Sequence, residues 1–270
     1  MKKKNLISLL LIGVLSIGLI GCGASGQAST SSSASKDLLG EIKERGTLKI
    51  GTEGTYAPYT YHNDKNELVG YDVEVGEAIA KELGVKAEFI ETPWDSCIAG
   101  LDAKRYDVVM NQVGITDERK AKYDFSTPYT VTRAVLIVGK DNQDIKKFED
   151  LKGKKAAQGL TSNFAEMSKS YGAELVDTDG AFSKSLDLIT SGRTDATIND
   201  DVTFYDYLKQ KPDAPLKIAD TLDKASENAV LIRKDNESFV KAVNDALAKL
   251  TKDGTLEQIS QKYFGTNVIK

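Results

Sequence analysis

One short pattern occurs twice in this chain and constrains its fold more than any other feature. Residues 105–111 read RYDVVMN and residues 193–199 read RTDATIN, so both contain Arg-x-Asp-x-x-x-Asn, and each copy follows a helical pattern. Both stretches have the composition of a buried strand. Two equivalent strands that end in an asparagine indicate two equivalent α/β units. Chance similarity between short strand-like strings is the alternative.

The sequence around each copy alternates between strand-like and helix-like segments. In the first unit the expected strands are TLKIGT, KAEFIET and YDVVMN, with helical segments between them in which apolar residues recur every three or four positions. After residue 150 the same order returns with the strands KKAAQG, AELVDT and DATIN. This alternation is typical of a mostly parallel sheet covered by helices, so the sequence predicts an α/β fold.

A second pair of similar strings indicates how the two units are joined. AVLIVGKDN at 134–142 and AVLIRKDN at 229–236 bracket the second unit. We expect the chain to cross to a second lobe at the first string and to return at the second, so that two strands form a hinge. The expected domains are lobe 1 over 37–138, lobe 2 over 139–228, and a return segment of lobe 1 over 229–270.

The N-terminal segment has the pattern of an export signal. Residues 1–21 contain three lysines and then an apolar stretch that is too short for a stable transmembrane helix. LIGC at 19–22 resembles a bacterial lipobox, which implies that Cys22 becomes a lipidated, palmitate-bearing first residue; a plain secretory signal is the alternative. Residues 22–36 are small and polar, as in a flexible linker. We therefore expect a lipid-anchored protein on the extracytoplasmic face of the cell membrane, and the long linker favours a Gram-positive surface.

Charge and cysteine content exclude several functions. Removal of the signal, with its three lysines, lowers the formal charge from −4 to −7, which argues against nucleic acid as a partner. Cys97 is the only cysteine besides Cys22, so no disulfide framework is expected, and the thiol is expected to pack as a small hydrophobe. The only histidine, His62, lies in a polar turn. We expect no catalytic residue, no metal and no cofactor.

The loops after the predicted strands contain the groups that a small zwitterion needs. Ligands of open α/β sheets bind beyond the carboxyl ends of the strands, and two facing lobes place these ends across a cleft. Arg119 is the one fixed cation, of the kind that binds an α-carboxylate, and Asp200 is one candidate among the loop carboxylates for an α-ammonium. Tyr56 and Trp94 provide aromatic walls, and Glu53 is a second carboxylate.

Each of these residues also has a simpler interpretation. Arg119 lies in a charged run, which is usually a solvated helix face. Asp200 stands where it could cap the next helix. The simpler roles of the other residues are helix capping for Thr161 and Ser162, core packing for Trp94, an ordinary loop position for Tyr56, and solvent exposure for Glu53.

Longer stretches resemble a known family. GYDVEVGEAIAKELG, LDAKRYDVVMNQVGITDERKAKYDFSTPY, DLKGKKAAQG and AVNDALAKLTKDGTLEQISQKYFG together resemble the solute-binding proteins of polar amino acid ABC importers, family 3 of the bacterial extracellular solute-binding proteins. EGTYAPY, TPWDS and NQVGITDERKAKYDFSTPYT are most similar to the cystine-binding subgroup. The resemblance implies a two-lobed type II periplasmic-binding-protein fold that closes on its ligand. It also implies a monomer without enzymatic activity whose partners are an importer permease and its ATPase.

The resemblance also implies roles for individual residues. Arg119 would hold the ligand α-carboxylate, and Asp200 would hold the α-ammonium. Backbone N–H groups at Gln112 and Gly114 and the loop at Thr161 and Ser162 would assist Arg119. Tyr56 and Trp94 would enclose the ligand side chain, with Glu53 at the pocket edge and Asn111 on the wall.

The predicted ligand is L-cystine. Glu53 and Asn111 are polar groups available for a second amino acid head, in agreement with the subgroup similarity. Glutamine, histidine and arginine are alternative ligands. A more distant alternative is a dehydratase-like enzyme on the same fold that uses Glu53 or Asp200 as acid or base.

Overall fold

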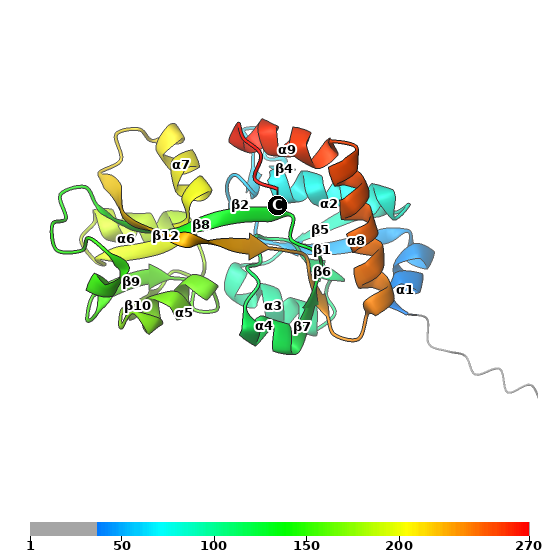
Figure 1. Ribbon diagram of the computed structural model, residues 1–270, viewed down its shortest axis with the longest axis horizontal. Helices are drawn as coiled ribbons and strands as arrows, with labels where there is room; N and C mark the ends of the chain where they lie inside the picture. The colour runs from blue at the N-terminus through cyan, green and yellow to red at the C-terminus, as the bar shows by residue number, and fades with distance from the viewer. Residues whose placement is uncertain (1–36, 270) are drawn as a thin grey trace, which may run out of the picture. The chain divides into compact units, whose positions relative to one another are not determined.

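The computed structural model describes residues 37–269. The predicted signal peptide, Cys22 and the linker lie outside the described residues. In the described part, strands and helices alternate in the predicted order, and two five-stranded sheets form the centres of two lobes (Figure 1). The predicted two-lobed α/β fold is confirmed.

The first lobe is built on a sheet that is parallel at one side and antiparallel at the other. In spatial order its strands are β5 (Lys86–Glu91), β1 (Thr47–Thr52), β6 (Val108–Val109), β13 (Leu231–Arg233) and β7 (Tyr123–Phe125). A small antiparallel sheet precedes the first long helix and contains β2 (Thr55–Tyr56), β3 (Thr60–His62) and β4 (Leu68–Val69). The main departure from the predicted parallel order is β13, which pairs antiparallel with both β6 and β7.

All the helices of the first lobe except α4 (Asp117–Lys122) bury apolar side chains, whereas the buried residue of α4 is Arg119. Phe239 and Val243 of the C-terminal segment are buried in the same cluster as Ile50 of β1 and Ile79, so this segment packs against elements of the first lobe. The helices are α1 (Leu38–Arg45), α2 (Tyr71–Glu82), α3 (Trp94–Asp102), α4 (Asp117–Lys122), α8 (Glu237–Lys252) and α9 (Thr255–Phe264).

The second lobe repeats the arrangement around its own sheet. Its strands, in spatial order, are β10 (Glu174–Asp177), β9 (Lys155–Gln158), β11 (Ala196–Asp200), β8 (Thr130–Gly139) and β12 (Leu216–Asn228). Its helices are the 3-10 helix η1 (Phe148–Leu151) and the α-helices α5 (Asn163–Ser170), α6 (Phe182–Thr190) and α7 (Asp201–Gln210).

Two long antiparallel strands, β8 and β12, connect the lobes (Figure 1). Residues 130–133 pair with residues 225–228, and beyond this pairing 134–138 joins β11 in the second sheet. After Asn228 the chain enters β13 in the first sheet. The two similar strings, 134–142 and 229–236, therefore each begin directly after the paired segments that connect the lobes. The domain boundaries drawn from these strings remain a prediction.

The repeated Arg-x-Asp-x-x-x-Asn pattern has the same structure in both lobes. Asp107 Oδ2 accepts from the N–H of Lys49 at 2.8 Å, and Asp195 Oδ2 accepts from the N–H of Lys155 at 2.7 Å. Each aspartate N–H also donates to the carbonyl of the same lysine, at 2.9 and 2.8 Å. Each aspartate thereby fixes the start of its strand to a neighbouring parallel strand, and the asparagine lies at the other end.

Candidate functional site

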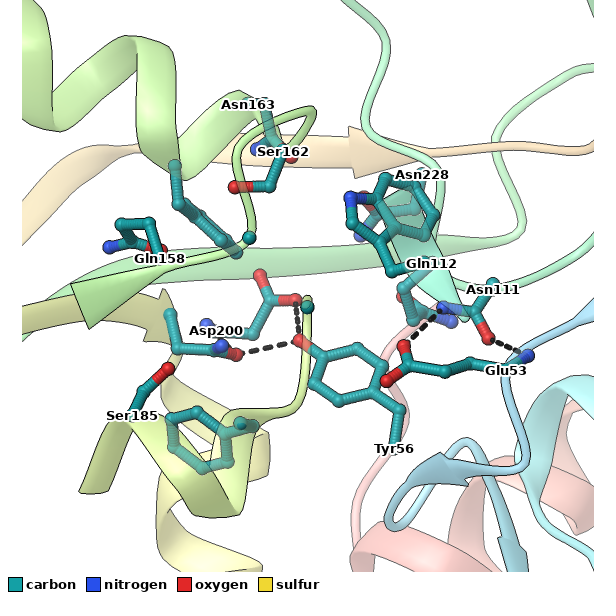
Figure 2. A pocket seen from close by; sticks show the side chains of 16 residues that line it. Glu53, Tyr56, Asn111, Gln112, Gln158, Ser162, Asn163, Ser185, Asp200 and Asn228 are labelled. Atoms are coloured by element: carbon teal, nitrogen blue, oxygen red, sulfur yellow. Dashed lines mark hydrogen bonds between the residues drawn. The ribbon is translucent and has the colours of Figure 1, made fainter. Parts of the chain in front are cut away.

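A pocket lies between the two lobes, at the carboxyl ends of the strands (Figure 2). Seven of the ten residues predicted for ligand binding line it. Its walls are formed by Glu53, Tyr56, Trp94, Asn111 and Gln112 of the first lobe, by Gln158, Gly159, Ser162, Asn163, Phe164, Gly180, Phe182, Ser185, Asn199 and Asp200 of the second, and by Asn228 of β12. The three predicted residues that do not line it are Gly114, Arg119 and Thr161.

Glu53 and Asn111 form one wall together. The Oε1 atom of Glu53 accepts from the Thr55 hydroxyl at 2.8 Å, and its Oε2 accepts from Asn111 Nδ2 at 3.3 Å. Asn111 Oδ1 in turn accepts from the backbone N–H of Glu53 at 2.8 Å. The carboxyl group is not solvated, since only 8% of Glu53 is exposed, and burial raises its pKa to about 6. The solvent-facing interpretation of Glu53 is wrong.

Gln112 directly follows Asn111 and is held by a residue that the sequence did not single out. Its backbone N–H donates to Asp72 Oδ2 at 2.8 Å, and its Nε2 donates to Asp72 Oδ1 at 2.7 Å and to the Thr130 hydroxyl at 3.2 Å. The N–H that the family resemblance assigns to the ligand carboxylate is thus bonded to Asp72 in this structure. Asp72 lies in the first turn of α2 and is buried, which raises its pKa to about 7.

Asp200 is the corresponding carboxylate of the second lobe. Its Oδ1 accepts from the Thr132 hydroxyl at 2.5 Å, and its Oδ2 accepts from the Tyr56 hydroxyl at 3.2 Å. Its side chain makes no capping bond to α7, so the capping interpretation is not supported. Burial raises the pKa of Asp200 to about 6. Tyr56 also donates to Asn199 Oδ1 at 2.6 Å and thereby joins the first lobe to the second (Figure 2).

Arg119 is buried, whereas Asp117, Glu118, Lys120 and Lys122 around it in α4 are exposed. Its solvated interpretation is therefore wrong. Its guanidinium donates to the carbonyl of Gly114 at 2.9 Å and, across the lobes, to the carbonyl of Thr161 at 3.2 Å. It also lies 5.6 Å from the centre of the Trp94 ring. Arg119 thus stands behind the Trp94 wall.

The loop at Thr161 is held from the first lobe on a second side. Asp95, in the first turn of α3, accepts from the Thr161 N–H at 2.9 Å and from the Thr161 hydroxyl at 2.8 Å. It also accepts from the Leu160 N–H at 3.3 Å. The next residue, Ser162, caps α5 by accepting from the Ala165 N–H at 3.0 Å, so its capping interpretation is confirmed while it also lines the pocket.

The pocket contains residues that sequence reasoning missed. Gln158 stands at a strand end, where the rule used for the other loops would have found it, whereas Phe182 and Ser185 project from a helix. Trp94 is in contact with the second lobe, because a Cβ atom on Gly180 would lie only 2.4 Å from the Trp94 Cβ.

The electrostatic character of the pocket is acidic. Glu53 and Asp200 are carboxylates on opposite lobes, and the lining contains no lysine or arginine. Over residues 37–269, no group of three or more potential metal-ligating side chains is arranged to hold a metal ion. In the same part of the chain, no helix is long and apolar enough to span a membrane. The arrangement is suited to an organic ligand that carries positive charge.

The chain belongs to the bacterial extracellular solute-binding proteins, family 3, whose family model matches residues 48–266. It is 44% identical to the L-cystine-binding protein TcyA of Bacillus subtilis (strain 168), over 100% of both chains. It is 42% identical to the L-cystine-binding protein TcyJ of Escherichia coli (strain K12), again over 100% of both. The relatives are named as binding proteins, in agreement with the expectation that this chain is not an enzyme.

Two solved structures give a conformational comparison. An ancestral arginine-binding protein bound to arginine is 38% identical and has a TM-score of 0.76, covering 82% of this chain and 99% of its own. The L-cystine solute receptor of Neisseria gonorrhoeae, in the unliganded open conformation, is 45% identical but has a TM-score of 0.56, covering 85% and 99%. The open receptor is thus more similar in sequence but less similar in structure than the arginine-bound protein. This difference agrees with the hydrogen bonds between the lobes described above, because those bonds require the lobes to lie close together.

Proposed function

We propose that this protein binds L-cystine between its two lobes and delivers it to the permease of an ABC importer. The observation that carries the proposal is the pair of buried carboxylates, Glu53 and Asp200, on opposite walls of a pocket without a lysine or arginine. Cystine has two amino acid heads and therefore two ammonium groups. The L-cystine-binding relatives support the same ligand.

Asp200 binds the first ammonium group, and Glu53 with Asn111 binds the second. Tyr56 and Trp94 cover the ligand between these ends. As the family resemblance implies, Arg119 binds a ligand carboxylate with Gly114, Thr161 and Ser162 close by, although Arg119, Gly114 and Thr161 do not line the pocket in this structure. Two N–H groups of Arg119 donate to carbonyls in this structure, and a guanidinium has five donors, so a ligand oxygen has donors available.

Hinge closure is the mechanism by which the ligand is enclosed. The hydrogen bonds of Tyr56 to Asp200 and of Asp95 and Arg119 to Thr161 all join the first lobe to the second. These bonds can form only when the lobes are close together. A ligand that contacts both walls stabilises the same arrangement and shifts the equilibrium towards it.

The protein is tethered by a lipid on Cys22 at the extracytoplasmic face of the membrane, at the surface of a Gram-positive cell, and acts as a monomer with the permease and its ATPase. The lipobox-like LIGC supports the anchor. A Cys22→Ser variant should fail to incorporate labelled palmitate and should leave the membrane fraction. Retention of both label and membrane association would contradict the anchor.

Ligand identity is tested by titration. Trp94 is the only tryptophan of the chain and lines the pocket, so its fluorescence reports on occupancy. We expect L-cystine to bind at about micromolar Kd, which needs about 8 kcal/mol. Two charge-assisted contacts of roughly 1.5 to 3 kcal/mol each, together with aromatic burial, supply that range. If L-cystine gave no signal while L-glutamine, L-histidine or L-arginine bound, the cystine assignment would be wrong. Glu53→Gln should weaken binding of L-cystine.

A further inference from the structure

Two buried polar atoms on residues that line the pocket have no hydrogen-bond partner: the donor Trp94 Nε1 and the acceptor Gln112 Oε1. Gln112 is 6% exposed, and its Nε2 has two acceptors, but its Oε1 is buried and accepts no hydrogen bond. A buried amide oxygen that faces no donor is disfavoured, because it has lost the hydrogen bonds that water would give it. Since Gln112 lines the pocket, a ligand is the natural source of the missing donor.

The orientation of the Gln112 amide is determined by Asp72. At pH 8, above its pKa of about 7, Asp72 is ionised and only accepts hydrogen bonds, so the amide must turn its NH₂ group, and not its oxygen, towards Asp72. The second carboxylate oxygen takes the backbone N–H of the same glutamine at 2.8 Å, which fixes the residue in the left-handed conformation with φ at 50°. A reversed amide would place Oε1 against the carboxylate. Asp72 therefore makes Oε1 the atom left without a partner.

The connecting strand β8 contacts both the Gln112 amide and Asp200. Thr130 accepts from the Gln112 amide and Thr132 donates to Asp200, and residues two apart on a strand share one face. The amide of the first lobe and the carboxylate of the second are thus tethered to neighbouring hydroxyls at the hinge. Figure 2 shows Gln112 beside Asn111 and Glu53, with Asp200 across the pocket.

We propose that Gln112 Oε1 accepts a hydrogen bond from the ligand ammonium that Asp200 binds, and that Asp72 is the positioning residue for this contact. The inference rests on the proposed function and deepens it. A primary ammonium has three N–H donors, so a single group can bind one acceptor on each lobe. This contact makes ammonium recognition a bond between the lobes, and it disfavours a ligand with a methyl or a hydrogen in place of the nitrogen.

The test is a thermodynamic cycle between a side chain and a ligand group. Trp94 fluorescence is titrated at pH 8 with L-cystine and with 3,3′-dithiodipropionate, which is cystine without its two amino groups, for the wild type and for Gln112→Met. We expect the variant to bind L-cystine about tenfold more weakly, because a charge-assisted bond is lost, and to bind 3,3′-dithiodipropionate with unchanged Kd. Asp72→Asn should give a smaller loss in the same direction, because an asparagine amide can face Gln112 with either end. Gln210→Met, on the exposed side of α7, is the matched control.

If Gln112→Met weakened the binding of L-cystine and of 3,3′-dithiodipropionate equally, the proposal would be overturned, because Gln112 would then contribute only to the packing of the pocket wall. A crystal structure of the wild type with L-cystine decides the question if either variant fails to fold. Gln112 Oε1 should lie within hydrogen-bond distance of a ligand nitrogen, about 3 Å, and a nearest nitrogen beyond about 4 Å would overturn the proposal.

The same measurements separate this proposal from the proposed function. If the wild type does not bind L-cystine but binds L-arginine, only the cystine assignment is overturned. The thermodynamic cycle is then measured with L-arginine and with 5-guanidinopentanoate, which lacks the α-amino group. A wild type that binds no amino acid overturns both.

Discussion

The Asp95 carboxylate in the first lobe accepts two hydrogen bonds from Thr161 in the second, one from its N–H at 2.9 Å and one from its hydroxyl at 2.8 Å. This contact lies outside the ligand pocket and stabilises only the closed arrangement. Asp95→Ala should therefore favour the open form and weaken L-cystine binding by about fivefold, equivalent to about 1 kcal/mol for a partly exposed contact.

Small-angle scattering of the ligand-free protein measures this shift as an increased radius of gyration. Asp102→Ala is the matched control, because Asp102 lies on the same helix and bonds to Tyr123 within the first lobe. An Asp95→Ala variant with unchanged scattering and unchanged affinity would show that the bond does not hold the lobes.

Arg119→Ala should lose about 2 to 5 kcal/mol of L-cystine binding, because the ligand carboxylate would be buried without its cation. Arg119→Lys should recover little of this loss, since an ammonium cannot form two parallel bonds to a carboxylate. Lys120→Ala, at an exposed position of the same helix, should bind like the wild type. Calorimetric titration measures all three, and wild-type affinity in Arg119→Ala would remove Arg119 from the site.

The affinity for L-cystine should fall at acid pH. The pKa of Asp200 is raised to about 6 in the ligand-free protein, and an ammonium group prefers the ionised form. Binding should therefore weaken about tenfold between pH 7 and pH 5 through this group alone. Asp200→Asn should bind weakly at both values and show less pH dependence. A wild-type Kd that is constant from pH 7 to pH 5 would contradict ammonium binding by Asp200.

The stability of the ligand-free protein should change in the opposite direction. Because burial raises the folded-state pKa of Asp200 to about 6 from an ordinary 3.8, the folded state holds this proton more tightly than the unfolded state. The stabilisation is complete below pH 3.8 and is lost as the pH rises through 6. The free energy of unfolding of the wild type, relative to Asp200→Asn, should thus decrease by up to about 3 kcal/mol from acid to neutral pH. Denaturant titrations at several pH values measure this difference, and a constant difference would contradict it.

Cys97 should not exchange with a cystine ligand, although it lies three positions after Trp94. Its thiol is fully buried, and burial raises its pKa to about 12. Disulfide exchange requires the thiolate. In a Cys22→Ser variant, where Cys97 is the only cysteine, intact mass should remain unchanged after incubation with L-cystine at pH 8. The same sample unfolded in guanidinium should gain a half-cystine, and a gain under native conditions would contradict the prediction.

Sequence reasoning found those pocket residues whose position follows from a strand end. Glu53 directly follows β1, Asn111 and Gln112 lie just beyond β6, and Asp200 ends β11. A strand can be recognised from its local sequence pattern. Because parallel strands have their carboxyl ends at the same edge of the sheet, the position of the residues that follow each strand can also be predicted. The lobe, the wall and the residue type were therefore accessible without a structure.

The orientation of side chains was not accessible in the same way. Asp72 looked like an ordinary residue in the first turn of a helix, yet its carboxylate holds a glutamine forty positions away in the sequence. Asp95 has a similar position and bonds a loop of the other lobe. No local pattern records such partners, because they depend on how the lobes pack. For the same reason the carbonyl partners of Arg119 were not predicted.

In the equivalent strands β6 and β11, the residues that stabilise the sheet and the residues that line the pocket lie at opposite ends. At their first half, Asp107 and Asp195 tie each strand to the backbone of its neighbour, and only at the far end do Asn111 and Asn199 reach the pocket. An exchange at one tip alters one end of the binding site without loosening either sheet. A receptor with this internal duplication can therefore change its requirement at one ligand head through a single substitution while the other head remains bound as before.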